Sequence, residues 1–376
     1  MGTRIDPRSL TRELLAFDTV NPPGMERACA RHLGAILEGA GFRTEYHEYA
    51  AGRTSLIARI GNGEAKPICF TGHMDVVPLG AAKWSHEPFA GETDGDRLFG
   101  RGSTDMKGGI AAFVAAAVEL APKLSRGPGL VLVITAGEEV GCEGARFLAD
   151  HKLLGQAGAI VVAEPTANYP YVGHKGLCWF EIETRGVTAH GSMPEVGDNA
   201  ILKMARVIGD LEHFRFPVEA HAVMGKPTLN VGTVHGGLNT NSVPDRACIT
   251  VDTRTVPGIE HAHLCRSLES LLAPRGAHVR KTVDVPALYT EPQETWIQEV
   301  FEASTPFVGE RPQPRTITFS TDGTDLKRGF GGAVPAVILG PGEPSLAHQT
   351  DEWCSMNRME QSVELFATLI RRWNGI

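Results

Sequence analysis

The sequence predicts an α/β fold with a mixed, largely parallel sheet and flanking helices, into which a smaller α+β module of the ferredoxin-like type is inserted. Two observations support this prediction. Short apolar runs typical of buried strands alternate with helical stretches up to about Gly173. The pattern then changes to strand, helix, strand, strand, helix, strand. We therefore predict a first domain over residues 1–175 that resumes over 287–376, and an inserted domain over 176–286.

The elements of the first domain follow from the spacing of its apolar residues. Residues 27–39 have apolar side chains at helical spacing and end in glycine, and residues 110–120 form an apolar helix. Residues 358–373 form a closing helix with one apolar face. Four short apolar runs are expected to be buried strands, at residues 68–70, 130–134, 159–162 and 334–339.

The elements of the inserted module alternate between two periodicities. Residues 199–214 place Ile201, Met204, Ile208 and Leu211 at helical spacing. The predicted strands of the module are residues 177–184, 228–234, 247–253 and a final one near 278–283.

Acidic and imidazole side chains stand where the strand-like runs of the first domain give way to turns. A single such residue at a loop tip is usually solvated. In an open α/β sheet, however, ligands bind at the carboxyl ends of the strands. Two histidines and at least four carboxylates that meet there indicate a metal site. The residues are His73, Asp75, Asp105, Glu138, Glu139, Glu164 and His348.

The ligand types narrow the choice of ion. Imidazole and carboxylate without thiolate suit Zn²⁺, Co²⁺ or Mn²⁺, whereas Ca²⁺ and Mg²⁺ prefer oxygen alone. We expect zinc, for which Co²⁺ can substitute. A lone catalytic zinc needs about three protein ligands, so the candidates suit two ions that share a carboxylate, with Asp105 as the natural bridge. The candidate ligands are His73, Asp105, Glu139, Glu164 and His348.

Two carboxylates beside these ligands are expected to act without binding metal. Asp75 follows His73 by two residues, so in extended backbone its carboxylate can accept the proton of the other imidazole nitrogen. Glu138 and Glu139 are adjacent and therefore point apart. One of them can bind metal while the other acts as general base towards a water.

Together these motifs resemble a known family. The segments G-H-M-D-V-V-P, D-G-D-R-L-F-G-R-G-S-T-D-M-K-G-G, T-A-G-E-E-V-G, E-P-T and A-H-Q-T-D-E are similar to those of the dinuclear zinc hydrolases that include acetylornithine deacetylase, succinyl-diaminopimelate desuccinylase, aminoacylase and carboxypeptidase G. The resemblance runs from Thr19 to the last helix. It implies a zinc-peptidase-like catalytic domain, an inserted lid or dimerisation domain, and a homodimer formed through that domain.

The resemblance also implies a role for each residue of the site. Asp75 becomes a supporting carboxylate, and Glu138 becomes the general acid/base. The ligands of one zinc would be His73, Asp105 and Glu164, and those of the other His348, Asp105 and Glu139.

The inserted module and a later loop contribute further candidates. The resemblance implies that His190, in T-A-H-G-S-M-P, reaches the active site of the opposite subunit and hydrogen-bonds the developing oxyanion. Asn241 and Arg254 match a substrate-contacting asparagine and an arginine that holds the substrate carboxylate, although their surroundings also suit a turn residue and a solvated strand end. Gly323 and Thr324, in S-T-D-G-T, are candidates for binding a carboxylate through their backbone.

Composition argues against several other kinds of protein. The formal net charge is −8 and no basic run is present, so we expect no nucleic acid partner. Seven scattered cysteines without a C-x-x-C pair indicate reduced thiols. The amino terminus lacks an apolar signal core, and no apolar run approaches the roughly 20 residues of a membrane span. We therefore expect a cytoplasmic protein without membrane contact.

The expected activity is hydrolysis of an amide bond in an N-acyl amino acid. Glu138 would take the proton of a zinc-activated water and pass it to the leaving nitrogen. A serine nucleophile is disfavoured because the chain has no G-x-S-x-G elbow. A catalytically inactive, zinc-binding dimeric protein is the non-enzymatic alternative, but a purely structural site has no use for the free carboxylate of Glu138.

The motifs point to more than one substrate. P-Y-V-G-H-K-G and V-I-L-G-P-G-E-P-S-L-A-H-Q-T-D-E-W are most similar to acetylornithine deacetylase, which makes N-acetyl-ornithine the first candidate. N-T-N-S-V-P-D is closer to the desuccinylase and to general deacylases. Succinyl-diaminopimelate desuccinylase activity is therefore the alternative, followed by cleavage of dipeptides or carbamoyl amino acids.

Overall fold

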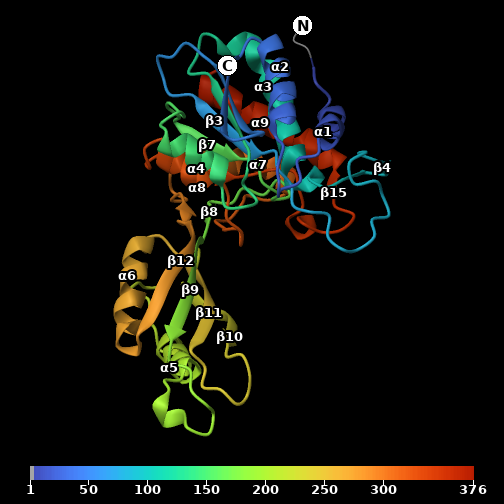
Figure 1. Ribbon diagram of the computed structural model, residues 1–376. Coiled ribbons are helices and arrows are strands. Elements are labelled where there is room, and N and C mark those ends of the chain that lie inside the picture. Colours follow the sequence, from blue (N-terminus) through green and yellow to red (C-terminus); the bar gives the residue numbers. More distant parts are fainter. Residues whose placement is uncertain (1–3) are drawn as a thin grey trace. The chain divides into compact units, whose positions relative to one another are not determined.

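The computed structural model describes residues 4–376, which form two compact units (Figure 1). The larger unit contains the described residues up to Gly173, together with Tyr289–Thr316 and Thr321–Ile376. The inserted unit contains His174–Leu288 and Ile317–Ser320. Residues 1–3 of the predicted first domain lie outside the described part of the chain. A short strand pair, β8 (Gly173–His174) with β13 (Leu288–Tyr289), lies where the chain passes between the units.

The larger unit is built on a six-stranded sheet of order β1-β2-β6-β3-β7-β14. The strands from β6 to β14 run parallel, whereas β1 and β2 run antiparallel to their neighbours. Every residue of the four parallel strands is buried, so both faces of the sheet are covered. The mixed, largely parallel sheet confirms the predicted fold class. The bounds are β1 Arg43–Ala50, β2 Arg53–Ile60, β3 Ile68–His73, β6 Leu130–Thr135, β7 Ala159–Val162 and β14 Ala336–Ile338.

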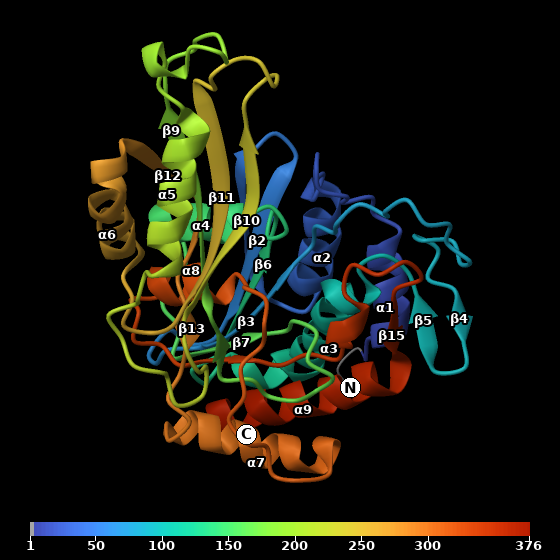
Figure 2. The ribbon, with the colours of Figure 1, turned by 90° about the horizontal axis from the view of Figure 1, so that it is seen from below.

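Helices pack on this sheet through aromatic and small apolar side chains. The ring of Phe70 on β3 contacts Phe113 of α3 and Phe366 of α9, with centroids 6.2 and 5.2 Å apart. Figure 2 shows α3 and α9 lying side by side. Helix α3 is apolar on nearly all sides because it packs between the sheet, α1 and α9. The bounds are α1 Pro7–Leu15, α2 Arg27–Gly39, α3 Gly108–Leu124, α4 Glu143–Asp150, α7 Thr295–Val308, α8 Gly323–Gly329 and α9 Met356–Asn374.

A small antiparallel sheet joins two distant parts of the larger unit. Its order is β15-β5-β4, and its strands are β4 (Thr93–Asp94), β5 (Arg97–Phe99) and β15 (Trp353–Ser355). Pairing of β15 with β5 fixes the chain just before β15 beside the chain just after β5. These two segments carry His348 and Asp105, respectively.

The inserted unit is an antiparallel sheet of order β10-β11-β9-β12 with two helices. With the chain order strand, helix, strand, strand, helix, strand, this arrangement is the predicted ferredoxin-like fold. Burial alternates along β9 and β11, because one face of the sheet packs against the helices. The bounds are β9 Gly176–Arg185, α5 Ala200–Glu212, β10 Thr228–Gly236, β11 Arg246–Thr255, α6 His261–Leu272 and β12 Ala277–Val285.

None of the helices formed by residues 4–376 is both long and apolar enough to cross a membrane.

Candidate metal centre

Four of the candidate ligands follow the parallel strands of the larger unit. β3 ends at His73, β6 leads into the turn that carries Glu139, and β7 is followed after one residue by Glu164. The loop after β14 carries His348. Because these strands are parallel neighbours, their carboxyl ends meet at one edge of the sheet. The fold therefore brings residues that are far apart in the sequence to one place.

The Asp105 carboxylate faces two histidines, one with each oxygen. Its Oδ1 lies 3.1 Å from Nε2 of His73, and its Oδ2 lies 3.4 Å from Nε2 of His348. Glu164 approaches the same nitrogen of His73 to 3.8 Å. Glu139 approaches the same nitrogen of His348 to 3.1 Å. We call these sets the His73 group (His73, Asp105, Glu164) and the His348 group (His348, Asp105, Glu139).

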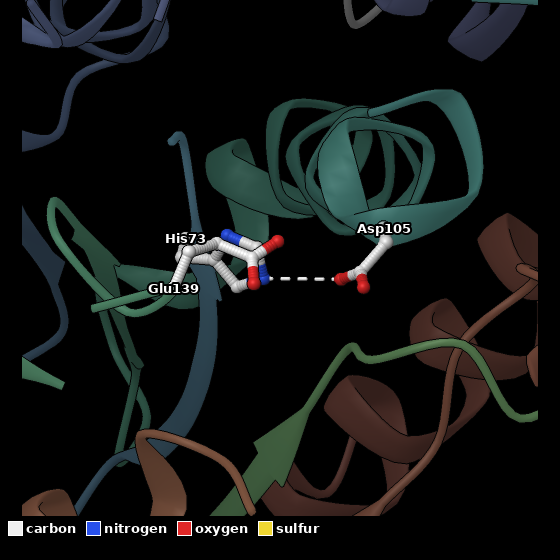
Figure 3. A group of neighbouring side chains, drawn as sticks. All are labelled: His73, Asp105 and Glu139. Carbon is white, nitrogen blue, oxygen red and sulfur yellow. Dashed lines mark hydrogen bonds and ion pairs between the residues drawn. The ribbon is translucent and has the colours of Figure 1, made fainter. Parts of the chain in front are cut away.

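The spacing of the ligand atoms suits a bound ion. Figure 3 shows the side chains of His73 and Glu139 opposite the carboxylate of Asp105. One ligand atom from each of these three residues lies within 4.8 Å of the other two. Zinc bonds of about 2.1 Å place the ligand atoms of one tetrahedral ion roughly 3.4 Å apart. Small movements of these side chains would therefore complete a coordination shell.

The charge of the centre also favours cations. The two imidazoles are accompanied by a larger number of carboxylates, and burial raises the pKa of Glu138 and of Glu164 well above the usual range. Buried negative charge is stable only when it is protonated or neutralised by a cation. The nearby buried arginines, Arg101 and Arg53, have carboxylate partners of their own. The carboxylates of the centre are Asp75, Asp105, Glu138, Glu139, Glu164 and Asp322.

Asp75 contacts His73 through a different atom from the one predicted. Its main-chain carbonyl lies 2.9 Å from Nδ1 of His73, whereas its carboxylate lies at 3.7 Å. The expected alternation fails because β3 ends at His73. The Asp75 carboxylate instead accepts hydrogen bonds from the main-chain N–H groups of Glu138 and Glu139, both at 3.1 Å, and from Nδ2 of Asn21 at 2.8 Å. Asp75 thus orients the imidazole with its backbone and the glutamate turn with its side chain.

Glu138 and Glu139 have different partners. The Glu139 carboxylate contacts His348, whereas the Glu138 carboxylate accepts a long hydrogen bond of 3.7 Å from Sγ of Cys142. Burial raises the pKa of Glu138 well above its usual range; His73 acts in the opposite direction, and the neighbouring carboxylates raise this pKa further. A carboxyl group with a raised pKa beside an ion site is suited to accept and return a proton.

Three polar residues that the sequence analysis did not select adjoin the centre. Asn21 donates to Asp75, and Glu352 accepts a hydrogen bond from the main-chain N–H of Asp105 at 3.0 Å. Asp322 is buried, and burial raises its pKa to about 7. Asp322 and Glu352 stand in motifs that the sequence analysis quoted, S-T-D-G-T and A-H-Q-T-D-E, so a signal for both was present.

The remaining candidates lie in two places. Gly323 and Thr324 are buried in the first turn of α8, in the larger unit. His190 and Asn241 lie on exposed loops of the inserted unit that pair with one another, since the N–H of Gly191 donates to the carbonyl of Asn241 at 2.7 Å. Arg254 lies on β11 of the same unit. Approach of the inserted unit's residues to the metal centre stays a prediction.

Comparison with known proteins identifies relatives along the whole chain. The family model described as peptidase family M20/M25/M40 matches residues 69–372. Acetylornithine deacetylase of Myxococcus xanthus is 32% identical over 390 residues, which cover 98% of this chain and 97% of that protein. A probable succinyl-diaminopimelate desuccinylase of Staphylococcus epidermidis is 29% identical over 353 residues, which cover 85% and 86% of the two chains.

Solved structures of this family share the fold. A Bacillus subtilis protein described as a dinuclear metal-binding peptidase of family M20 superposes with a TM-score of 0.71 at 17% identity, over 97% of this chain and 96% of that one. The relatives are hydrolases of amide bonds, which argues against the non-enzymatic alternative. The family model covers most of the chain, and the chain therefore belongs to peptidase family M20/M25/M40, a family of metal-dependent hydrolases.

Proposed function

We propose that this protein hydrolyses the amide bond of an N-acyl amino acid with two zinc ions, one held by the His73 group and one by the His348 group. One observation supports this proposal above the others. The two oxygens of Asp105 face two different histidines, each of which has its own glutamate. This is the arrangement expected of a carboxylate shared by two ions. When bound, zinc would supply an activated water and polarise the amide carbonyl.

Side chains of the site would perform the remaining steps of the reaction. Glu138, which directly precedes Glu139 but hydrogen-bonds neither histidine, would hold the proton of the attacking water and deliver it to the leaving nitrogen. Asp75 keeps the turn of Glu138 and Glu139 in place through two main-chain hydrogen bonds. Asp75 is fully buried, whereas Glu138 and Glu139 are only partly buried.

The assignment of an N-acyl amino acid as the substrate rests on the sequence motifs and on the relatives together. The chain covers nearly all of an acetylornithine deacetylase at 32% identity, and N-acetyl-ornithine is the first substrate to test. A succinylated diamino acid is the second, because the chain also matches a probable desuccinylase. Assay of a panel of N-acyl amino acids with Zn²⁺ or Co²⁺ would distinguish these substrates.

Metal content tests the two-ion site directly. We expect about two zinc ions per chain at saturation, because each group offers three ligands with Asp105 shared. Elemental analysis after loading the metal-free protein and removing free zinc gives the number. Full activity with a single ion per chain would contradict the two-ion proposal.

Arg254 is expected to bind the carboxylate of the substrate. It shares β11 with Arg246, and each arginine pairs with one carboxylate, Asp252 and Glu183 respectively. We expect Arg254→Ala to raise KM by about 10- to 100-fold for an N-acyl amino acid, and to change little for the matching amide. Arg246→Ala is the matched control and should alter neither. An equal loss on acid and amide would assign Arg254 a structural role.

We also propose a homodimer formed through the inserted unit, in which His190 acts across the interface. That unit exposes large apolar side chains, with Leu202 57%, Val234 60% and Leu238 96% exposed. Mixing His190→Ala with Glu138→Gln subunits should restore up to about a quarter of the activity, because hybrid dimers contain one intact site. Each variant mixed with itself is the control. Proven subunit exchange without recovery would show that His190 does not act in trans.

A further inference from the structure

The carboxylate of Glu352 is fully buried and contacts none of the side chains of the candidate metal ligands. Its Oε1 accepts hydrogen bonds from the main-chain N–H groups of Thr104 and Asp105, at 2.9 and 3.0 Å. Its Oε2 accepts from the N–H of Gly102 at 3.0 Å and from Nη1 of Arg101 at 2.7 Å. Four donors from residues 101–105 therefore converge on one side chain. Both of its oxygens are satisfied, although the residue has no exposed surface.

Arg101, the ion-pair partner of Glu352, contacts the main chain of His348. It is 1% exposed, and its guanidinium donates to the main-chain carbonyls of His348 at 3.3 Å, Gln349 at 3.2 Å and Pro78 at 3.2 Å. The same ion pair thus contacts the backbone of Asp105 through Glu352 and the backbone of His348 through Arg101. Asp105 and His348 are the two residues whose side chains face each other at 3.4 Å.

The backbone around Asp105 explains why an acceptor is needed there. Residues 103–107 form a short π-helical turn before α3, in which Asp105 (φ −123°, ψ 90°) and Met106 (φ −137°, ψ 30°) depart from helical dihedral angles. The N–H groups of Gly102, Thr104 and Asp105, at the start of this turn, donate to Glu352. Buried N–H groups without partners are costly. A charged carboxylate at this position satisfies three of them at once and forms the stronger, charge-assisted type of hydrogen bond. Glu352 therefore holds the backbone conformation that turns the Asp105 carboxylate towards both histidines.

We infer that Glu352 is a positioning residue for the metal centre. Through its ion pair with Arg101, it sets the position of the Asp105 backbone relative to the His348 backbone. It thereby sets the distances between the ligands of the His348 group. The inference rests on the proposed two-ion site. The His73 group depends on it less, because His73 and Glu164 are held by the strand ends of the central sheet. Loss of Glu352 should accordingly weaken one ion more than the other.

The test is zinc titration of Glu352→Gln in competition with a chromophoric chelator. Supporting groups around metal ligands typically contribute about 10- to 100-fold to metal affinity. We expect one of two tight zinc ions to bind at least about tenfold more weakly, because the glutamine amide places N–H donors against those of Gly102 and Arg101. The absorption spectrum of the Co²⁺-loaded variant should also change, since it reports ligand geometry independently of turnover.

Glu26→Gln provides the matched control. Glu26 is equally buried and pairs with Arg53 at 2.9 Å, but neither residue hydrogen-bonds the backbone of a candidate ligand. Both variants should lower the melting temperature, and only Glu352→Gln should lower zinc affinity. If Glu352→Gln does not fold, Glu352→Asp carries the test, because it keeps the charge but is too short to reach all four donors.

Two outcomes separate the inference from the proposed function. Wild-type protein that binds fewer than two zinc ions would overturn the two-ion site. Wild-type protein that binds two, with Glu352→Gln binding both as tightly as Glu26→Gln does, would leave the two-ion site intact and overturn the positioning role of Glu352.

Discussion

Replacement of Glu138 by glutamine is expected to lower kcat by about 10²- to 10⁴-fold while both metal ions stay bound. Glutamine has nearly the same shape but cannot accept and return a proton. The Glu138 carboxylate contacts Cys142 and neither histidine of the centre, so no ligand is removed. Steady-state kinetics and elemental analysis on the same preparation measure the two quantities together.

Two further variants show whether the loss is specific to Glu138. Glu143→Gln removes the same charge from an exposed position five residues later, where the side chain accepts a hydrogen bond from Tyr49, and should leave kcat nearly unchanged. Glu139→Gln should weaken the ion of the His348 group as well as the activity, because Glu139 contacts His348. Equal loss of zinc from the Glu138 and Glu139 variants would mean that both glutamates are ligands.

The position of the centre could be predicted because strand ends are readable in the sequence. Runs such as residues 68–70 and 159–162 are short, apolar and followed within three residues by His73 or Glu164, and parallel strands bring such ends to one edge. By contrast, the hairpin of β1 and β2 was not predicted. Most of β1 is only partly buried, so it lacks the apolar run that marks the parallel strands.

The supporting contacts could not be predicted in the same way. Glu352 and Arg101 are 251 residues apart, and no local spacing connects them. Their pairing follows from the antiparallel contact of β15 with β5, which depends on the complete fold. The hydrogen bonds of Asp75 could not be predicted in full either. The sequence indicated a role beside His73, but the end of β3 decides which atom of Asp75 makes the contact.

Replacement of Asp105 by asparagine is expected to remove tight binding of both zinc ions, and activity with them. Asp105 is the one candidate ligand that contributes to both groups, with Oδ1 towards His73 and Oδ2 towards His348. The amide keeps one oxygen and turns an NH₂ group towards the other ion, where it cannot bind metal. It also removes negative charge that attracts both cations.

Variants that change a ligand of only one group serve as the comparison for Asp105→Asn. Glu164→Gln should weaken mainly the ion of the His73 group, and Glu139→Gln mainly that of the His348 group, so each should retain about one zinc ion. Thermal unfolding supplies a second readout, because zinc at about a thousand times its Kd should stabilise the folded wild-type protein by roughly 4 kcal/mol per ion. That zinc-dependent rise in melting temperature should nearly vanish in Asp105→Asn. Retention of one tightly bound ion by Asp105→Asn would show that Asp105 belongs to a single group and does not bridge two ions.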